Sequence, residues 1–203
     1  MRPLLISDCD EVLLHMVSHF AEWLDEEHRV RFAFETGRFA DAFTSEAGEL
    51  LEREEVWTLL GQFFREQMHR QTLVPGAIEA LGRIGEVADI VILSNLNDEA
   101  REWRVDQLAG HGIRHEVICN RGGKGPPVAE LVRQRQATST VFVDDLPQHH
   151  ESVAEQAPQV WRLHMIAEPR VAATVPPAEH AHARIDDWAS ASDWILDRLQ
   201  EQA

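Results

Sequence analysis

The sequence predicts an α/β protein built on a parallel sheet with helices on both faces. The first observation is a strict alternation of helix-like and strand-like segments over the last two thirds of the chain. The second is that four strand-like apolar runs are each followed directly by polar side chains. Repeated β-α-β units with short connections form parallel sheets, whose ligands bind outside the carboxyl ends of the strands. A binding crevice is therefore expected where these runs end.

The first third of the chain carries fewer strand signals. Residues 3–7 are short, apolar and followed by acids, which is typical of a buried strand. Residues 12–27 place apolar side chains at helical spacing and predict a helix, and residues 46–70 predict one or two more. The helical block 13–72 thus follows the first strand, where it would form a lid over the carboxyl edge of the sheet.

The alternation begins after the break at Val74-Pro75-Gly76. Pro127 stands where the first turn of a helix tolerates proline. Pro-rich sequence separates the last strand from the closing helix. Helices are expected over 76–86, 98–110, 127–136, 147–157 and 188–199, and strands over 88–93, 115–119, 140–143 and 160–165.

Bulk composition argues against two classes of partner. The 203 residues are 44% hydrophobic, enough for one ordinary domain or a core with a small appendage. The formal net charge of −16 argues against nucleic acid and membrane surfaces, because both require a basic face. A small phosphorylated substrate needs only local positive charge and is compatible with this composition. No pattern indicates an oligomeric state.

Targeting and cysteine signals predict a cytoplasmic protein. The positions of Cys9 and Cys119 argue against a disulfide, and two free thiols are typical of a reducing compartment. The N-terminus has no signal-peptide pattern, and no apolar run approaches the ~20 residues of a membrane span.

The polar groups at the strand ends supply carboxylates, a hydroxyl, an amide and a cation. Such a set suits a phosphate group and a divalent metal. The groups are Asp8 and Asp10 after residues 3–6, Ser94 and Asn95 after 90–93, Lys124 after 116–119, and Asp144 and Asp145 after 141–143.

Asp8 and Asp10 stand at positions i and i+2, where both can reach one ligand. A carboxylate can attack phosphorus and form an aspartyl-phosphate, and a neighbouring acid can serve as general acid and base. The structural alternative is that these acids cap the following helix. Ser94 and Asn95 can hydrogen-bond a phosphoryl oxygen, although both are also ordinary turn residues.

Lys124 is the only lysine in the chain, and the other 18 basic residues are arginines. Lysine is a compact point charge, whereas arginine is a wide planar fork. A site that needs one small cation beside carboxylates would reject arginine. The alternative is a solvated loop lysine, but the position in a glycine-rich loop between a strand and a helix favours a functional cation.

Asp144 and Asp145 indicate a metal site. Adjacent carboxylates repel each other unless a cation lies between them. Mg²⁺ prefers a few carboxylates together with water and phosphate oxygens. We therefore expect at least one of the two to bind Mg²⁺, while the other could cap the helix that begins near Pro147.

The order Asp-x-Asp-x-Val, hydrophobic-Ser, Lys and hydrophobic-Asp-Asp resembles the motif series of the haloacid dehalogenase superfamily. The resemblance covers about residues 1–12 and 73–165. It implies a Rossmann-like α/β core of residues 1–12 and 73–203, with a small helical cap domain of residues 13–72 inserted between the first and second motifs. The matching residues are Asp8, Asp10 and Val12, then Ser94, then Lys124, and finally Asp144 with Asp145.

The resemblance implies a role for each matching residue. Asp8 would be the nucleophile that forms an aspartyl-phosphate, and Asp10 would protonate the leaving group and then activate water. Ser94 and Lys124 would hold the phosphoryl oxygens. Mg²⁺ would be bound by Asp8, the backbone carbonyl of Asp10, and Asp144 or Asp145. Two positions depart from the pattern: Lys124 is followed by Gly-Pro-Pro instead of Pro, and Glu11 stands where a small residue is common.

Several other residues are weaker candidates. His15 and His19 stand four residues apart on an expected helix and could bind a metal, although 11 histidines make a chance pair plausible. His149 and His150 follow the last motif and could be exposed or packed at a helix start. The aromatic residues Trp23, Trp57, Phe63 and Phe64 could line a substrate pocket or pack the core of the cap.

The leading expectation is a Mg²⁺-dependent phosphomonoesterase that acts on a small soluble metabolite. A dehalogenase is disfavoured, because dehalogenases of this superfamily lack the second aspartate and need no metal. A phosphomutase is compatible with a helical cap. A non-catalytic binding protein on this fold is disfavoured by the intact set of acids and Lys124. No motif in residues 13–72 names the substrate.

Overall fold

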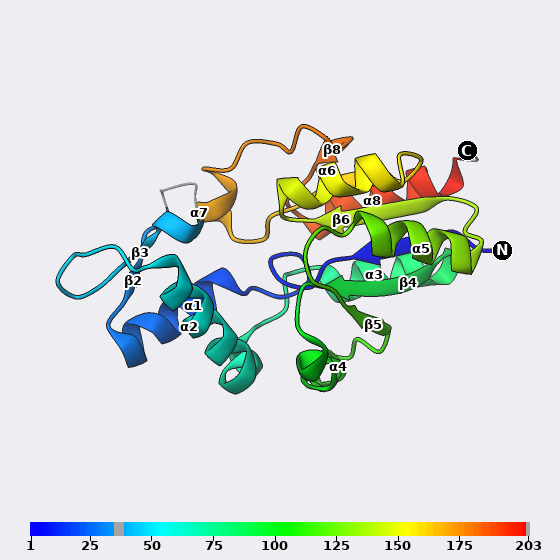
Figure 1. Cartoon of the computed structure of the whole chain (residues 1–203). Helices are drawn as coiled ribbons and strands as arrows, with labels where there is room; N and C mark the ends of the chain where they lie inside the picture. Colours follow the sequence, from blue (N-terminus) through cyan, green and yellow to red (C-terminus); the bar gives the residue numbers. More distant parts are fainter. Residues whose placement is uncertain (35–38, 202–203) are drawn as a thin grey trace.

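A parallel sheet forms the centre of the molecule, in a computed structural model that describes residues 1–34 and 39–201 (Figure 1). The strands of this sheet are β1 (Leu4–Ser7), β4 (Asp89–Ser94), β5 (Glu116–Cys119), β6 (Thr140–Asp144), β7 (Trp161–His164) and β8 (Ala183–Arg184). Within the described residues these six strands follow the order β5-β4-β1-β6-β7-β8, and every neighbouring pair is parallel. The predicted α/β class with a parallel sheet is therefore confirmed.

Helices cover both faces of this sheet, as the sequence predicts (Figure 1). They are α3 (Ala77–Val87) and α8 (Trp188–Gln200) on one face, α5 (Gly125–Arg135) and α6 (Pro147–Gln156) on the other, and α4 (Arg101–Gly110) beside β5. Alternate residues of β1 serve the two layers: Leu5 packs in the cluster that contains α3 and α8, whereas Leu4 and Ile6 pack in the cluster that contains α5 and α6. This burial on both faces explains why the strands are continuous apolar runs.

The segment between β1 and α3 forms a second unit with its own apolar core. α1 (Val17–Trp23) continues as the π-helical turn η1 (Leu24–His28), and α2 (Arg53–Glu66) follows later in the segment. At the centre of this core, the ring of Phe20 lies with its centroid 5.3 Å from that of Phe63 and 5.8 Å from that of Phe43. The arrangement fits the expected insertion, whose boundaries at 13–72 stay a prediction.

The structure departs from the expected elements at the two linkers between these units. The helix expected over 12–27 begins only at Val17. Before it, the N–H of His15 donates to the carbonyl of Thr72 at 2.9 Å, and the N–H of Val74 donates to the carbonyl of Leu13 at 2.9 Å. The segment that leaves the core after β1 is thus hydrogen-bonded to the segment that returns to it before α3. This non-local pairing takes the place of the first turn of the expected helix. Four short elements were also not expected: the antiparallel pair β2 (Arg31–Phe32) and β3 (Phe43–Thr44), α7 (Pro169–Ala172) and the edge strand β8.

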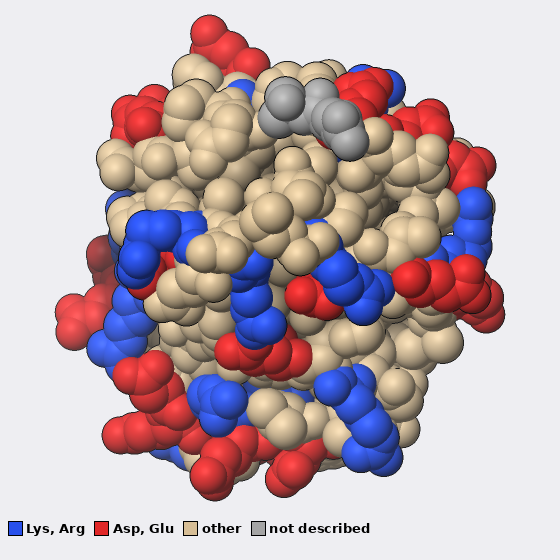
Figure 2. Space-filling model, turned by 90° about the vertical axis from the view of Figure 1, so that its right-hand side faces the viewer, with Lys and Arg blue, Asp and Glu red and all other residues tan. Residues whose placement is uncertain are grey.

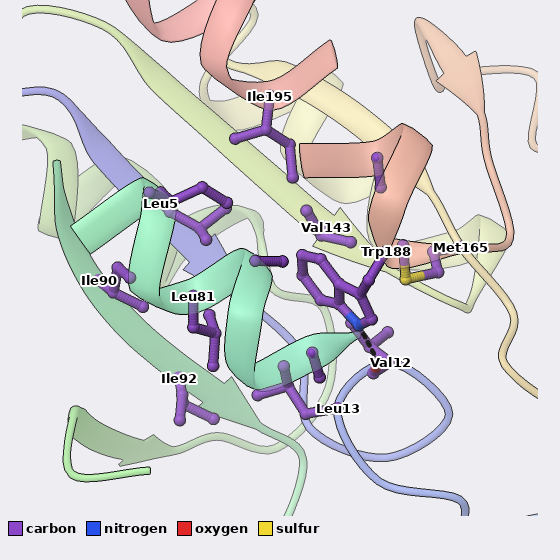
Figure 3. Packing of buried hydrophobic residues seen from close by; sticks show 14 of the residues in the cluster. Leu5, Val12, Leu13, Leu81, Ile90, Ile92, Val143, Met165, Trp188 and Ile195 are labelled. Atoms are coloured by element: carbon purple, nitrogen blue, oxygen red, sulfur yellow. Dashed lines mark hydrogen bonds between the residues drawn. The ribbon is translucent and has the colours of Figure 1, made fainter. Parts of the chain in front are cut away.

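Trp188, the first residue of α8, connects this closing helix to the loop after β1 by a hydrogen bond. Its side chain is fully buried, and its indole N–H donates to the carbonyl of Val12 at 2.8 Å (Figure 3). Gly76 adopts a φ of 83°, in the left-handed region, and a Cβ there would lie 3.3 Å from the Cβ of Trp188. Glycine at this position therefore permits both the turn before α3 and the approach of α8.

Gly125 allows α5 and α6 to pack closely, and we expect Gly125→Ala to destabilise the chain. A Cβ at this position would lie 2.0 Å from the carbonyl oxygen of Ser152, a backbone atom that cannot turn aside. Overpacking of this kind typically costs about 1–3 kcal/mol or more. Urea unfolding measures the effect. Gly82→Ala is the matched control, because nothing lies within 4 Å of its Cβ and alanine favours a helix. Equal stability of the two variants would contradict this account.

Charged side chains of both signs are interspersed on the face that carries the chain termini (Figure 2). At the surface of the molecule, Arg83 pairs with Asp193 at 2.7 Å. That face therefore presents no continuous basic surface, although the absence of a nucleic-acid partner stays a prediction. No helix within the described residues has the length and apolar character needed to span a membrane.

Candidate active site

The polar residues predicted at the strand ends gather at one edge of the sheet. Asp8 directly follows β1, Ser94 is the last residue of β4, and Asp144 is the last residue of β6. Because β1 pairs with both β4 and β6, the three strand ends lie side by side. Lys124 immediately precedes α5 and reaches the same place. Parallel topology thus brings together groups that are far apart in the sequence.

Lys124 lies between two of these acids and is fully buried. Its Nζ is 2.8 Å from Oδ1 of Asp8 and 2.7 Å from Oδ2 of Asp144. Burial alone would lower the pKa of Lys124, but the charges of Asp144 and Asp8 outweigh it and raise the pKa above its usual value. The side chain is therefore a permanent cation. A compact ammonium between two carboxylates is the environment that the single lysine predicted.

Asp8, Asp144 and Asp145 form an acidic cluster that one lysine does not neutralise. One oxygen from each carboxylate lies within 4.8 Å of the others. Burial raises the pKa of Asp8, Lys124 opposes this shift, and Asp144 adds to it. Burial and the charges of Asp144 and Asp8 raise the pKa of Asp145 well above its usual value. Three acids beside a single ammonium leave an excess of negative charge, so this oxygen-rich site fits a divalent cation such as Mg²⁺.

Ser94 contributes a buried hydroxyl that has no hydrogen-bond partner within the described residues. A buried polar group without a partner costs free energy, so such groups in native structures call for an explanation such as a ligand. This hydroxyl lies at the end of β4, next to the strand that carries Asp8. It is therefore placed at the edge where it could donate a hydrogen bond to a phosphoryl oxygen.

Asn95 lies at the same edge, but its side chain is engaged in hydrogen bonds with neighbouring loops. Its Nδ2 donates to the carbonyl of Gly122 at 3.0 Å and lies 3.2 Å from Nε2 of His149, while its Oδ1 accepts from Asn120 at 3.0 Å. The predicted phosphate contact of Asn95 would therefore require its backbone N–H or a rearranged side chain. His149 is buried at the start of α6, so of the two alternatives offered for it, packing at the helix start applies and exposure does not.

His150 and His164 support the backbone of the acidic pair. The Nε2 atom of His150 donates to the carbonyl of Asp144 at 3.0 Å, and that of His164 donates to the carbonyl of Asp145 at 2.9 Å. Burial lowers the pKa of His150 to about 3, so this imidazole is neutral, and the proton on its Nε2 is the one it donates to Asp144. His150 is thus packed at the helix start, as one of the two alternatives predicted.

Asp10 does not join the acidic cluster. Its carboxylate is paired with Arg104 of α4, whose Nη2 lies 2.9 Å from Oδ1 and 2.8 Å from Oδ2. Oδ1 also accepts from Nε2 of Gln71 at 2.7 Å. Sequence reasoning did not identify Arg104 or Gln71. The signal for Arg104 was its spacing: it lies four residues before Leu108, on the buried face of α4, where a charge requires a partner.

Glu11 occupies the position where a small residue was expected, and its backbone explains that preference. Its φ is 59°, in the left-handed region that favours glycine. The buried carboxylate compensates: Oε1 accepts from the N–H groups of Met16 and Val17, each at 2.7 Å, and Oε2 accepts from the N–H of Glu168 at 2.9 Å. Glu11 thereby joins the start of α1 to the segment before α7.

Glu11→Gln is expected to destabilise the chain by about 1–3 kcal/mol although it removes a buried charge. All three partners donate, so the amide NH₂ of glutamine would face an N–H donor and leave it unsatisfied. Denaturant unfolding measures the effect, with the exposed Glu155→Gln on α6 as control. A Glu11→Gln variant as stable as the wild type would contradict this account.

The stability of the wild type and that of the Glu11→Gln variant should depend differently on pH. Burial raises the pKa of Glu11 from 4.5 to about 7, against the effect of the three N–H donors. Between these pH values the folded chain binds this proton more tightly than the unfolded chain does, so the wild type loses stability as the pH rises. The glutamine variant lacks this slope, and its destabilisation is therefore expected to be larger at pH 5 than at pH 8.

The remaining candidates have other surroundings. His19 contacts Thr72 at 3.0 Å, and within the described residues neither it nor His15 belongs to a group that could hold a metal. Trp23 and Phe63 are buried in the core of the helical unit, and Trp57 is 56% exposed. Packing thus explains the first two.

Phe64 packs, partly buried, against that core, and its ring also lies next to Arg104 of α4. It lines a cavity of about 480 Å³ between the end of α2 and α4, together with Trp103 and His111. None of the strand-end acids lines this cavity. It is therefore separate from the acidic cluster.

No protein-family model matches the sequence, and no curated protein matches it significantly. Solved structures do resemble the fold. A haloacid dehalogenase-like hydrolase from Streptococcus pneumoniae has a TM-score of 0.66 at 11% identity, covering 95% of this chain and 98% of that one. A phosphoserine phosphatase described as a phospho-aspartyl intermediate analogue has a TM-score of 0.60 at 16% identity, covering 96% and 99%.

A third similar structure is a protein from Bacillus subtilis that is assigned as a HAD-hydrolase and described as bound to magnesium. Its TM-score is 0.63 at 13% identity, covering 96% of this chain and 98% of that one. At these identities the likeness establishes the fold alone. The chain has the haloacid dehalogenase-like fold, as the order of its motifs predicted.

Proposed function

We propose that this chain is a Mg²⁺-dependent phosphomonoesterase that acts on a small phosphorylated metabolite through an aspartyl-phosphate on Asp8. The observation that carries this proposal is the buried ammonium of Lys124 between Asp8 and Asp144, 2.8 Å and 2.7 Å from their oxygens. A nucleophilic carboxylate must approach an anionic phosphoryl group, and a fixed cation beside it reduces the repulsion.

The hydrogen bonds of Asp8 favour one of its two oxygens as the nucleophile. Oδ1 accepts from the N–H of Cys9 at 2.7 Å and from Lys124 at 2.8 Å, whereas no contact of Oδ2 is found within the described residues. Two donors therefore hold the carboxylate in one orientation and leave Oδ2 to attack phosphorus. Ser94 Oγ and Lys124 Nζ are the donors that would hold the phosphoryl oxygens.

Asp10 would protonate the leaving group and then take a proton from the attacking water. Its carboxylate must reach the substrate for either task, and in this structure Arg104 and Gln71 hold it while its side chain stays 15% exposed. The aspartyl-phosphate forms when the Asp8 oxygen binds phosphorus and the leaving oxygen departs. It is cleaved when water oxygen binds phosphorus, the bond to Asp8 breaks and the proton passes to Asp10.

Asp8, Asp144 or Asp145, and the backbone carbonyl of Asp10 would hold the Mg²⁺ ion. When bound, Mg²⁺ supplies positive charge against the phosphoryl oxygens and orients them. The excess of acids over cations in the cluster supports this assignment. So do two similar structures, one described as a phospho-aspartyl intermediate analogue and one as bound to magnesium.

A phosphatase screen tests this proposal. The chain is incubated with p-nitrophenyl phosphate and with a panel of phosphorylated metabolites, in Mg²⁺ and in chelator, and phosphate release is measured. We expect release that requires Mg²⁺. Release of halide from 2-haloacids without metal would favour the dehalogenase alternative, and transfer of phosphate between sugar positions would favour a mutase. Absence of every activity, together with Mg²⁺-dependent binding of a phosphate ester, would favour a binding protein.

A further inference from the structure

We propose that Arg104 is a positioning residue that, with Gln71, sets the orientation of the Asp10 carboxylate and makes it depend on the linker that returns from the helical unit. This inference rests on the proposed function, because it assigns Arg104 an effect on the acid–base step of that reaction. It concerns a residue on α4 that does not touch the acidic cluster.

The Arg104–Asp10 pair has the properties of a fixed contact. The Arg104 side chain is fully buried, and its Nη2 contacts both oxygens of Asp10, at 2.9 Å and 2.8 Å. Its Nη1 donates to Sγ of Cys9 at 3.2 Å, the residue between Asp8 and Asp10. A buried guanidinium that loses its carboxylate leaves an uncompensated charge, so the pair is costly to break. Arg104 thus contacts both Cys9 and Asp10 in the loop that carries the proposed catalytic acids.

Gln71 adds a second donor whose direction is determined by its neighbours. The Oε1 atom of Gln71 accepts from Nη1 of Arg104 at 3.3 Å and from Nε2 of Gln107 at 3.2 Å. Because the amide oxygen faces these two donors, the amide nitrogen must face Asp10, which it contacts at 2.7 Å. Every contact of the Asp10 carboxylate described here is therefore with a donor, and these donors act as one unit.

This network includes the linker from the helical unit to the core. Gln71 directly precedes Thr72, whose carbonyl accepts from the N–H of His15 on the other linker. Gln107 of α4 also donates to the carbonyl of Met68. A shift of the returning linker would therefore move the donor that faces Asp10. The orientation of this acid is thus coupled to the position of the helical unit through Gln71 and Gln107, without any contact to the substrate.

The loss of Arg104 should slow the two chemical steps unequally when the substrate is p-nitrophenyl phosphate. Transfer to Asp8 releases p-nitrophenolate, a stable anion that needs no proton from Asp10. Cleavage of the aspartyl-phosphate requires Asp10 to accept the proton of water as the P–O bond to Asp8 breaks. A misoriented acid typically costs about 10²-fold in such a step. Phosphoenzyme should then accumulate.

Rapid mixing of the full chain with p-nitrophenyl phosphate and Mg²⁺ tests this inference. For Arg104→Gln we expect a burst of about one p-nitrophenolate per chain, followed by turnover at least about tenfold slower than that of the wild type. Arg101→Gln is the matched control, because this exposed arginine of α4 donates, within the described residues, only to the carbonyl of Val117. It should behave as the wild type does. Gln71→Met, which keeps the Arg104–Asp10 pair, should show a smaller change of the same kind.

A double variant separates positioning from a general structural role. If Arg104 acts through Asp10, then Asp10→Asn combined with Arg104→Gln should turn over no more slowly than Asp10→Asn alone. The inference would be overturned if the losses of turnover in the two single variants multiplied in the double variant. It would also be overturned if the burst rate and the steady-state rate of Arg104→Gln fell by the same factor. If Arg104→Gln does not fold, Gln71→Met decides by the same burst measurement. A wild type that releases no p-nitrophenolate refutes the proposed function as well, whereas an active wild type with an unchanged Arg104→Gln variant refutes this inference alone.

Discussion

Asp8→Asn is expected to abolish turnover, by about 10⁴-fold or more, without unfolding the chain. The amide cannot form an aspartyl-phosphate, and Oδ2 of Asp8 is the oxygen that the surrounding donors leave available. The change keeps the shape of the side chain. Phosphate release measures the loss, and Asp193→Asn at an exposed pair with Arg83 is the control that should keep full activity. Turnover within tenfold of the wild type would remove the covalent mechanism.

The same variant should be as stable as the wild type or more stable when metal is absent. Burial raises the pKa of Asp8, and Asp144 adds to the shift, so the ionised carboxylate disfavours the folded state. A raised pKa means that the folded chain binds this proton more tightly, and stability is lost as the pH rises through the shifted range. Removing the charge removes that loss, while Asp144 remains as a partner for Lys124. Urea unfolding in chelator at neutral pH measures the effect, and a strongly destabilised Asp8→Asn would contradict it.

Lys124→Met is expected to cost both stability and activity. The substitution leaves the carboxylates of Asp8 and Asp144 without their shared cation, and removing one partner of a buried ion pair typically costs about 3–5 kcal/mol. Loss of one charge-stabilising group in an active site typically lowers turnover by about 10²–10³-fold. Unfolding and phosphate release, both at saturating Mg²⁺, measure the two effects. Retained stability together with retained activity would contradict the assigned role.

Lys124→Arg separates charge from shape at the same position. Arginine restores the positive charge, but its planar fork is wider than the ammonium of Lys124, which is fully buried between two carboxylates. Overpacking is expected to cost about 1–3 kcal/mol, and turnover should remain well below that of the wild type. A fully active Lys124→Arg variant would mean that the single lysine of the chain reflects composition and not chemistry.

Features that depend on local sequence were predicted well. Strands buried on both faces need unbroken apolar runs, so segments such as 88–93 and 140–143 were recognised and the structure places β4 and β6 there. The polar residue after each run has to lie at the carboxyl edge of a parallel sheet. This topological rule correctly predicts that Asp8, Lys124 and Asp144 lie close together.

Features that depend on distant partners were not predicted. The first turn of the helix expected over 12–27 is replaced by pairing of Leu13 and His15 with residues about 60 positions away. The strands β2 and β3 are two residues each, too short to produce a periodic signal. Asp10 was expected beside the nucleophile, and no local pattern reveals that an arginine 94 positions away holds it.

The sequence by itself determined the α/β class, the order of the motifs and the chemical types of the groups at the sheet edge, because burial periodicity and parallel topology are encoded over a few residues at a time. Only the tertiary structure decided where each carboxylate points. It placed Asp8 on Lys124 and Asp10 on Arg104, since a buried charge takes the partner that the folded backbone brings within reach. That choice is made by packing between segments far apart in the chain, and no local pattern contains it.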